Sequence, residues 1–237
     1  KKLTNKKTQV SSGTGFSINK NGHVLTNYHV IDGCDDVYVI YKDKQYEGEI
    51  IAFDVVNDLA LIKADKKNKL FLNFSNKKPE LLSEVFVAGF PFGKNLSSSI
   101  KVTKGIISSL SGLGNNVNQV QIDAAIQPGN SGGPILNNKG NLVGIAVAKL
   151  DLKKIIKDFG TIPENVNFGI KSTTVGNFLQ TNGVTFKTSS SFFKMNSKKL
   201  GKLINASTHY ISCWMSGEKV TKLKSRKVFF DEFNKED

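Results

Sequence analysis

The chain has 237 residues, a net charge of +13, and hydrophobic and aromatic contents of 39% and 9%. This composition is typical of a folded domain with a core of its own, and it argues against intrinsic disorder. No apolar run approaches the roughly 20 residues of a membrane-spanning helix. The polar start at residues 1–4 shows no signal peptide, so we expect the numbering to start at a mature or trimmed N-terminus, and removal of a signal stays open.

The positive charge is spread along the chain and is densest in residues 184–237, which contain 11 Lys and Arg against 5 Asp and Glu. A basic surface attracts anionic lipids, nucleic acids and acidic polypeptides. The basic residues are not interleaved with the aromatic side chains on which bases stack. We therefore expect a solvated lysine-rich surface with at most weak attraction to acidic surfaces, and no specific nucleic-acid partner.

Short runs rich in β-branched and aromatic residues recur through the first 150 residues, with hairpin turns such as Asn21-Gly22 between them. Long amphipathic helices are scarce before residue 165, which argues against βαβ units. Many closely spaced short strands predict an all-β barrel or sandwich. One helix is predicted after Ser172, ending at Asn182-Gly183. The expected strands are 24–26, 37–41, 46–53, 59–63, 85–89, 100–110, 120–122 and 142–148.

The character of the chain changes at about Val184, where a lysine-rich stretch follows. Within that stretch the apolar residues 211–215 are predicted to pack as a strand. We interpret 184–237 as a basic extension docked on the preceding domain, 1–183. Two cysteines, Cys34 and Cys213, are too few for a zinc site. They permit one disulfide that closes a long loop, and two buried free thiols are an equally weighted alternative.

The strongest local motif is residues 127–134, QPGNSGGP. A nucleophilic serine needs its hydroxyl on a tight turn, close to backbone N–H groups that stabilise an oxyanion. Glycines on both sides allow backbone conformations that are closed to other residues. Ser131 is therefore the candidate nucleophile. Residues Gly129, Asn130 and Ser131 form the expected oxyanion hole, with the N–H groups of Gly129 and Ser131 as its donors.

A serine nucleophile also needs a general base and a carboxylate that orients it. His29 follows a predicted strand, and Asp58 stands at the start of the apolar run 59–63. The chain order His29, Asp58, Ser131 is that of chymotrypsin. The competing residues are the histidines His23 and His209 and the acid Asp54.

An alternative is the nucleophile elbow of α/β-hydrolases, which the pattern Gly129-x-Ser131-x-Gly133 also satisfies. That fold requires the order Ser, Asp, His, here Ser131, then Asp151 or Asp158, then His209. It also requires alternating strands and helices ahead of the serine, which the sequence does not show. The chymotrypsin order is therefore favoured.

Taken together, the motifs resemble in order those of the HtrA/Deg family of trypsin-like serine proteases, over about residues 10–183. The resemblance implies two six-stranded antiparallel β-barrels with the active site between them and a C-terminal helix. It also implies a serine endopeptidase with His29 as base, Asp58 as its orienting acid and Ser131 as nucleophile, with no metal or cofactor. The motifs that carry it are residues 12–16, 25–31, 57–63 and 123–134, followed by the last-strand motif 167–171.

The sequence departs from the family pattern in three places. Residues 184–237 are too few for a confident PDZ domain, and we expect none. Residues 1–10 lack the aromatic side chains that make trimer contacts in the family, so monomer and trimer both stay open. Asn130 stands where digestive relatives have the aspartate that pairs with a newly cut N-terminus, so we expect no such activation.

The resemblance also indicates a substrate preference. Ala125, six residues before Ser131, takes the position at the base of the specificity pocket, with Ile145, Ala146 and Val147 as walls. Such an uncharged pocket predicts cleavage after small or medium apolar residues, in unfolded polypeptides, as in protein quality control.

Two other functions stay open: a holdase or scaffold that acts by binding, and a protease that processes a single partner docked on the basic extension. Bacterial members of the family are mostly exported, which predicts a periplasmic or otherwise exported protein.

Overall fold

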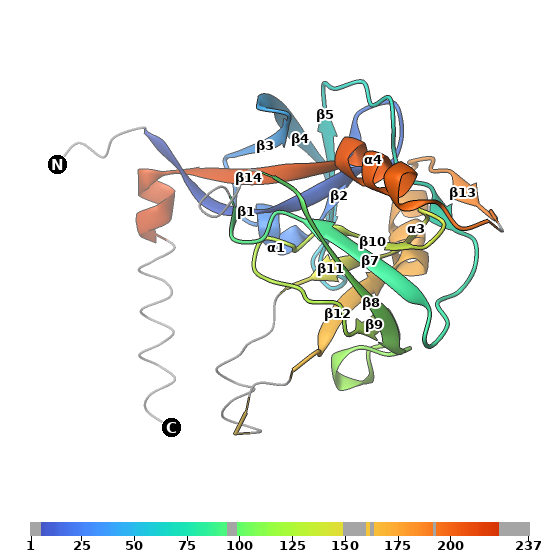
Figure 1. Ribbon diagram of the computed structural model, residues 1–237. Coiled ribbons are helices and arrows are strands. Elements are labelled where there is room, and N and C mark those ends of the chain that lie inside the picture. The colour runs from blue at the N-terminus through green and yellow to red at the C-terminus, as the bar shows by residue number, and fades with distance from the viewer. Residues whose placement is uncertain (1–5, 94–98, 149–159, 162–163, 192, 223–237) are drawn as a thin grey trace.

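The computed structural model describes residues 6–93, 99–148, 160–161, 164–191 and 193–222, and it contains two β-barrels (Figure 1). In the first barrel the strands close in the order β1-β14-β3-β4-β5-β2. In the second the order is β10-β7-β8-β9-β12-β11, and pairing of β10 with β11 closes the ring. The predicted fold, two six-stranded antiparallel barrels, is confirmed.

Hydrophobic side chains fill each barrel, and a third cluster, which includes Phe16, Leu25 and Leu136, joins the two. Two short strands, β6 (Phe74–Ser75) and β13 (Thr188–Ser189), extend the second barrel in parallel beyond β11. The first barrel comprises β1 (Lys7–Ser17), β2 (His23–Thr26), β3 (Asp36–Tyr41), β4 (Lys44–Asp54), β5 (Leu59–Ala64) and β14 (Thr208–Ser216). The second comprises β7 (Glu84–Gly89), β8 (Lys101–Ser109), β9 (Gln119–Ile122), β10 (Pro134–Asn137), β11 (Leu142–Val147) and β12 (Asn167–Lys171).

The helical segments lie outside the barrels. The helix expected after Ser172 is present as α3 (Ser172–Thr181), whose residues Val175 and Leu179 pack into the shared core. Within the described ranges, no helix is long and apolar enough to cross a membrane. Other helical segments in the described ranges are α1 (Tyr28–Ile31), the 3-10 turn η2 (Leu113–Asn115) and α4 (Ser197–Ser207), and residues 217–222 after β14 are also helical.

The strand β14 comes from the C-terminal part of the chain and lies between β1 and β3 (Figure 1). Its residue Tyr210 is paired with Thr14 on one side and with Ile40 on the other. Ile211 and Cys213 are fully buried in the barrel. Because both edges of β14 are hydrogen-bonded, this strand is an integral part of the first barrel, the barrel to which α1 belongs. The predicted extension 184–237 is described only as far as Lys222, apart from residue 192.

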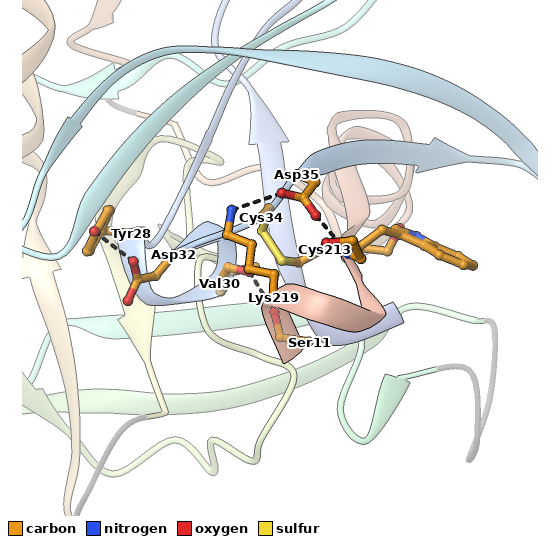
Figure 2. The surroundings of a disulfide bond; sticks show 11 residues. Ser11, Tyr28, Val30, Asp32, Cys34, Asp35, Cys213 and Lys219 are labelled. Carbon is orange, nitrogen blue, oxygen red and sulfur yellow. Dashed lines mark hydrogen bonds and ion pairs between the residues drawn. A yellow bond between two sulfur atoms is a disulfide. The ribbon is translucent and has the colours of Figure 1, made fainter. Parts of the chain in front are cut away.

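A disulfide joins Cys213 of β14 to Cys34, just after α1 (Figure 2). Of the two alternatives that the sequence left open, the structure therefore shows the disulfide. Asp35 adds further contacts beside it, since its carboxylate accepts from the Ser216 N–H at 2.7 Å and from Lys219 Nζ at 2.9 Å. The hydrogen bond from Ser216, followed by that from Lys219, lowers the pKa of Asp35. The end of β14 is thus fixed to the segment that follows α1.

Because of the disulfide, we expect the free energy of unfolding to depend on whether reductant is present. Its two cysteines are 179 residues apart, and a bridge that closes so long a loop restricts the unfolded chain strongly. We expect reduction to lower the free energy of unfolding by about 2–5 kcal/mol, measured by urea unfolding with and without reductant. A Cys34→Ser/Cys213→Ser variant should be less stable and insensitive to reductant. Two titratable thiols in the denatured, non-reduced protein would contradict the bridge.

The first barrel also buries an uncharged histidine. His209 of β14 is fully buried, with its Nε2 2.6 Å from the Ser17 hydroxyl and its ring edge-on to Tyr41. Desolvation, together with the positive charge of Lys66, lowers the pKa of His209 to about 3 from its ordinary value of 6.5. The barrel therefore holds this imidazole neutral, whereas the unfolded chain takes up a proton below pH 6.5.

This burial predicts acid lability. A histidine whose pKa is lower in the folded state stabilises the fold above pH 6.5 and loses that contribution as the pH falls towards 3. The free energy of unfolding should drop by up to about 1.4 kcal/mol per pH unit in this window. In urea unfolding between pH 7 and 4, His209→Gln should flatten this slope, while His23→Gln, at a half-buried site, should keep most of it. An unchanged slope in His209→Gln would refute the assignment.

Candidate active site

Asp58 contacts His29 at two points. The carboxylate Oδ2 lies 2.7 Å from Nδ1 of the imidazole, and Oδ1 accepts from the His29 backbone N–H at 2.9 Å. Asp58 has a φ of +54°, a conformation that few residues other than glycine adopt. Its backbone carbonyl accepts from the Tyr28 N–H and from the Asn27 side-chain amide. The start of β5 is thus held against α1, which fixes the carboxylate next to Nδ1 of the ring.

This pairing determines the tautomer of His29. An ionised carboxylate only accepts hydrogen bonds, so the proton of the neutral ring lies on Nδ1, facing Asp58. Nε2 then carries a free lone pair and can act as a base. Both side chains are about three-quarters buried, with 22% and 25% of their surface exposed. The pair is therefore largely shielded from solvent.

The competing residues have other partners. Asp54 accepts from the backbone and side chain of Asn57 and so closes the turn between β4 and β5. His23 contacts the side chain of Asn19, and His209 contacts Ser17 inside the first barrel. The acids of the elbow alternative, Asp151 and Asp158, lie outside the described residues.

Ser131 lies on a turn that packs against the first barrel. Gly132 has a φ of +81°, and a Cβ there would collide with the Thr14 carbonyl and the Thr26 hydroxyl and lie 2.9 Å from the Asn27 nitrogen. Only glycine allows this approach. The Ser131 carbonyl also accepts from the Thr14 N–H at 2.8 Å. The turn that carries Ser131 is thus held against the segment that leads to His29.

The backbone N–H groups around Ser131 differ in their partners. The Asn130 N–H donates to the Gln127 carbonyl at 2.9 Å, so this member of the predicted oxyanion hole is already engaged. Within the described part of the chain, neither the Gly129 nor the Ser131 N–H donates a hydrogen bond. The Ser131 hydroxyl oxygen accepts from the Ala148 N–H at 3.2 Å, which leaves the hydroxyl proton available.

The four residues of the predicted specificity pocket differ in how far they are buried. Ala125 is exposed, and its carbonyl accepts from the Thr103 hydroxyl. Ile145 and Ala146 are both 0% exposed and belong to the hydrophobic cores, whereas Val147 is half-buried. Ile145 lies in the cluster that joins the two barrels and Ala146 in the cluster that fills the second, so only Val147 of the three predicted wall residues has a partly exposed side chain.

Sequence reasoning missed two residues that contact the serine turn. Thr14 bonds to Gly129 and Ser131, and Ala148 bonds to the Ser131 hydroxyl. Thr14 lies within the motif 12–16, but its sequence position indicates only a buried strand residue and not a contact with the serine turn. The Ala148 contact uses only a backbone N–H, so no side-chain pattern could have revealed it.

Comparison with known proteins settles the family. The model of the trypsin-like peptidase domain matches residues 13–145, more than half of the chain, and includes His29, Asp58 and Ser131. The chain belongs to this family. The match runs from within β1 to within β11, so it ends before β12 and before the segment that contributes β14.

Individual relatives of this trypsin-like peptidase domain agree with that assignment. An uncharacterized protein of Sinorhizobium fredii is 34% identical over 204 residues, covering 86% of this chain and 32% of the relative. A protein named Protease Do-like 1, chloroplastic, of Arabidopsis thaliana is 38% identical, covering 70% and 38%. A probable periplasmic serine endoprotease, DegP-like, of Chlamydia muridarum is 39% identical, covering 57% and 28%. The chain spans about a third of the length of these relatives.

Among solved structures, the serine endoprotease from Yersinia pestis is similar to this chain, with a TM-score of 0.60 and 30% sequence identity. The similarity covers 72% of this chain and 57% of that one. The predicted resemblance to the HtrA/Deg type of trypsin-like protease is thereby confirmed.

Proposed function

We propose that this chain is a serine endopeptidase that cleaves polypeptides through an acyl-enzyme on Ser131. The observation that carries the proposal is the double contact between Asp58 and His29, next to a serine turn with two N–H groups that donate to no residue in the described ranges. The Asp58 carboxylate fixes the imidazole in the tautomer that a general base needs. Family membership and the serine endoproteases among the relatives support the same chemistry.

In the proposed reaction, the Ser131 oxygen attacks the scissile carbonyl while the hydroxyl proton passes to Nε2 of His29. The N–H groups of Gly129 and Ser131 stabilise the negative oxygen of the tetrahedral intermediate. His29 then gives its proton to the leaving amine as the C–N bond breaks. Water, deprotonated by His29, attacks the acyl-enzyme and releases the acid, which restores the Ser131 hydroxyl. Asp58 stays ionised and stabilises the imidazolium.

The proposed substrates are unfolded polypeptides in an exported compartment. The disulfide between Cys34 and Cys213 supports an oxidising location, because such bonds are rare in reducing cytosol. The periplasmic serine endoproteases among the relatives point the same way. A role in protein quality control follows from the apolar preference proposed for the pocket.

The triad assignment predicts a specific pattern of loss. Asp58→Asn keeps the shape of the side chain but presents an amide to Nδ1, which disfavours the working tautomer, so kcat should fall by about ten-thousandfold. Ser131→Ala should abolish labelling by a fluorophosphonate probe and casein cleavage. Asp54→Asn, the same change at an acid that closes a turn, should retain activity at equal folded fraction. Equal casein cleavage by wild type and Ser131→Ala would rule out the proposed function.

The pocket predicts apolar specificity. In a peptide library, cleavage should be concentrated after Ala, Val, Ile and Leu, because Ala125 offers no charge to a Lys or Arg side chain. Ala125→Asp should reduce cleavage after apolar residues and raise cleavage after Lys and Arg, measured as the ratio of kcat/KM values. Strong cleavage after Lys or Arg by the wild type would show that the pocket is assigned wrongly.

A further inference from the structure

The orientation of one peptide group decides whether the proposed oxyanion hole is open. The Pro128 carbonyl accepts from the Phe92 N–H at 2.7 Å. In a planar trans peptide the C=O and N–H groups point in opposite directions, so this bond turns the Gly129 N–H away from Phe92. Gly129 has a φ of +99°, and a Cβ there would collide with the Phe90 carbonyl. The turn at 90–93 is therefore the support against which the oxyanion peptide rests.

This supporting turn is itself strained. The Gly93 N–H donates to the Phe90 carbonyl at 3.1 Å, which closes a four-residue turn. Phe92, its third residue, has a φ of +57°, a left-handed conformation that is unfavourable for a residue with a Cβ. Half of the Phe92 surface is exposed, so packing of its own side chain contributes little to holding this conformation. The turn has to be held by its neighbours.

Two neighbours hold the turn, and both belong to the first barrel. The buried Thr14 hydroxyl accepts from the Phe90 N–H at 3.1 Å and donates to the Gly129 carbonyl at 2.7 Å. The Tyr210 ring meets the Phe90 ring edge-on, with 5.9 Å between centroids and an 88° angle. A Cβ on Gly93 would lie 3.3 Å from the Tyr210 hydroxyl, so the phenol also limits the other end of the turn.

Strand pairing explains why these two residues act together. Thr14 of β1 and Tyr210 of β14 are directly opposite each other, so their side chains project from the same face. Tyr210 is 4% exposed, and its hydroxyl accepts from the Gln9 side-chain amide at 2.7 Å. The disulfide at Cys213 fixes the same strand three residues further on. A rigid strand from the C-terminal part of the chain thus lies behind the turn at 90–93.

We propose that Tyr210 is a positioning residue: β14 holds the oxyanion peptide open through the turn at 90–93. This inference rests on the proposed function. It makes the C-terminal strand, which lies outside the matched family domain, a determinant of transition-state binding rather than a part of the scaffold only. Removal of the Tyr210 ring leaves the strained turn without its packing partner, and the Pro128–Gly129 peptide loses its fixed orientation.

The test compares Tyr210→Leu with wild type on a chromogenic peptide whose residue before the cut is Val. We expect kcat to fall about 10- to 100-fold, less than the full loss of an oxyanion donor, with KM nearly unchanged. Affinity for a peptide boronate, which mimics the tetrahedral intermediate, should fall by the same factor. Affinity for the unreactive product peptide should not change. If Tyr210 had a purely structural role, the substitution would reduce the fraction of folded protein. The apparent kcat and the binding signals for the boronate and the product peptide would then all fall together.

Two variants serve as controls. Tyr210→Phe keeps the ring contact with Phe90 and should retain most of kcat. Trp214→Leu removes another aromatic ring from the same strand, one that meets Tyr38 edge-on, and should cost stability without affecting kcat per folded molecule. If Tyr210→Leu does not fold, Phe90→Leu removes the same contact from the second barrel without changing β14, and it should reproduce the loss of kcat.

The outcomes separate this inference from the proposed function. Cleavage that depends on Ser131, together with unchanged kcat in Tyr210→Leu or Phe90→Leu, overturns the inference alone. An equal loss of kcat in Trp214→Leu also overturns it, because the effect would then belong to the barrel in general. Absence of Ser131-dependent cleavage in the wild type overturns the proposed function and this inference with it.

Discussion

The structure depends on closure of the first barrel by β14. In a closed barrel every strand is hydrogen-bonded on both edges, and β1 is paired with β2 on one side and with β14 on the other. This same β1 contributes Thr14, whose backbone and side chain bond to the Ser131 and Gly129 carbonyls. The strand that must be paired to complete the barrel is therefore also the strand that holds the serine turn.

The two halves of the proposed site are built by different means. His29 and Asp58 both lie at the mouth of the first barrel, where local hydrogen bonds between α1 and the start of β5 fix them. Ser131 belongs to the second barrel, and Gly132 beside it permits close approach to the Thr26 hydroxyl and the Asn27 nitrogen of the first. Close main-chain contacts at the serine turn thus add to the hydrophobic cluster that joins the two barrels.

Features carried by local sequence could be predicted, and features that depend on distant pairing could not. The glycine-rich turn at Ser131, the barrel fold and helix α3 follow from short motifs and turn residues. The apolar run 211–215 indicated a strand, but nothing in its pattern specified β1 and β3 as neighbours, since their partner residues lie some 170–210 positions away. The burial of Ile145 and Ala146 was missed for a related reason: β11 is covered on both faces, so the period-two alternation that separates inside from outside is absent.

The late position of β14 in the chain has a consequence for folding. Pairing of β1 with β14 joins residues about 200 positions apart, and such contacts reward folding only after the entropy of a long loop has been lost. The first barrel can therefore close only when the segment beyond α4 is available, and the disulfide at Cys213 then makes that closure covalent. Because Thr14 and Tyr210 become opposite neighbours at this same step, closure of the barrel and support of the turn at 90–93 are one event.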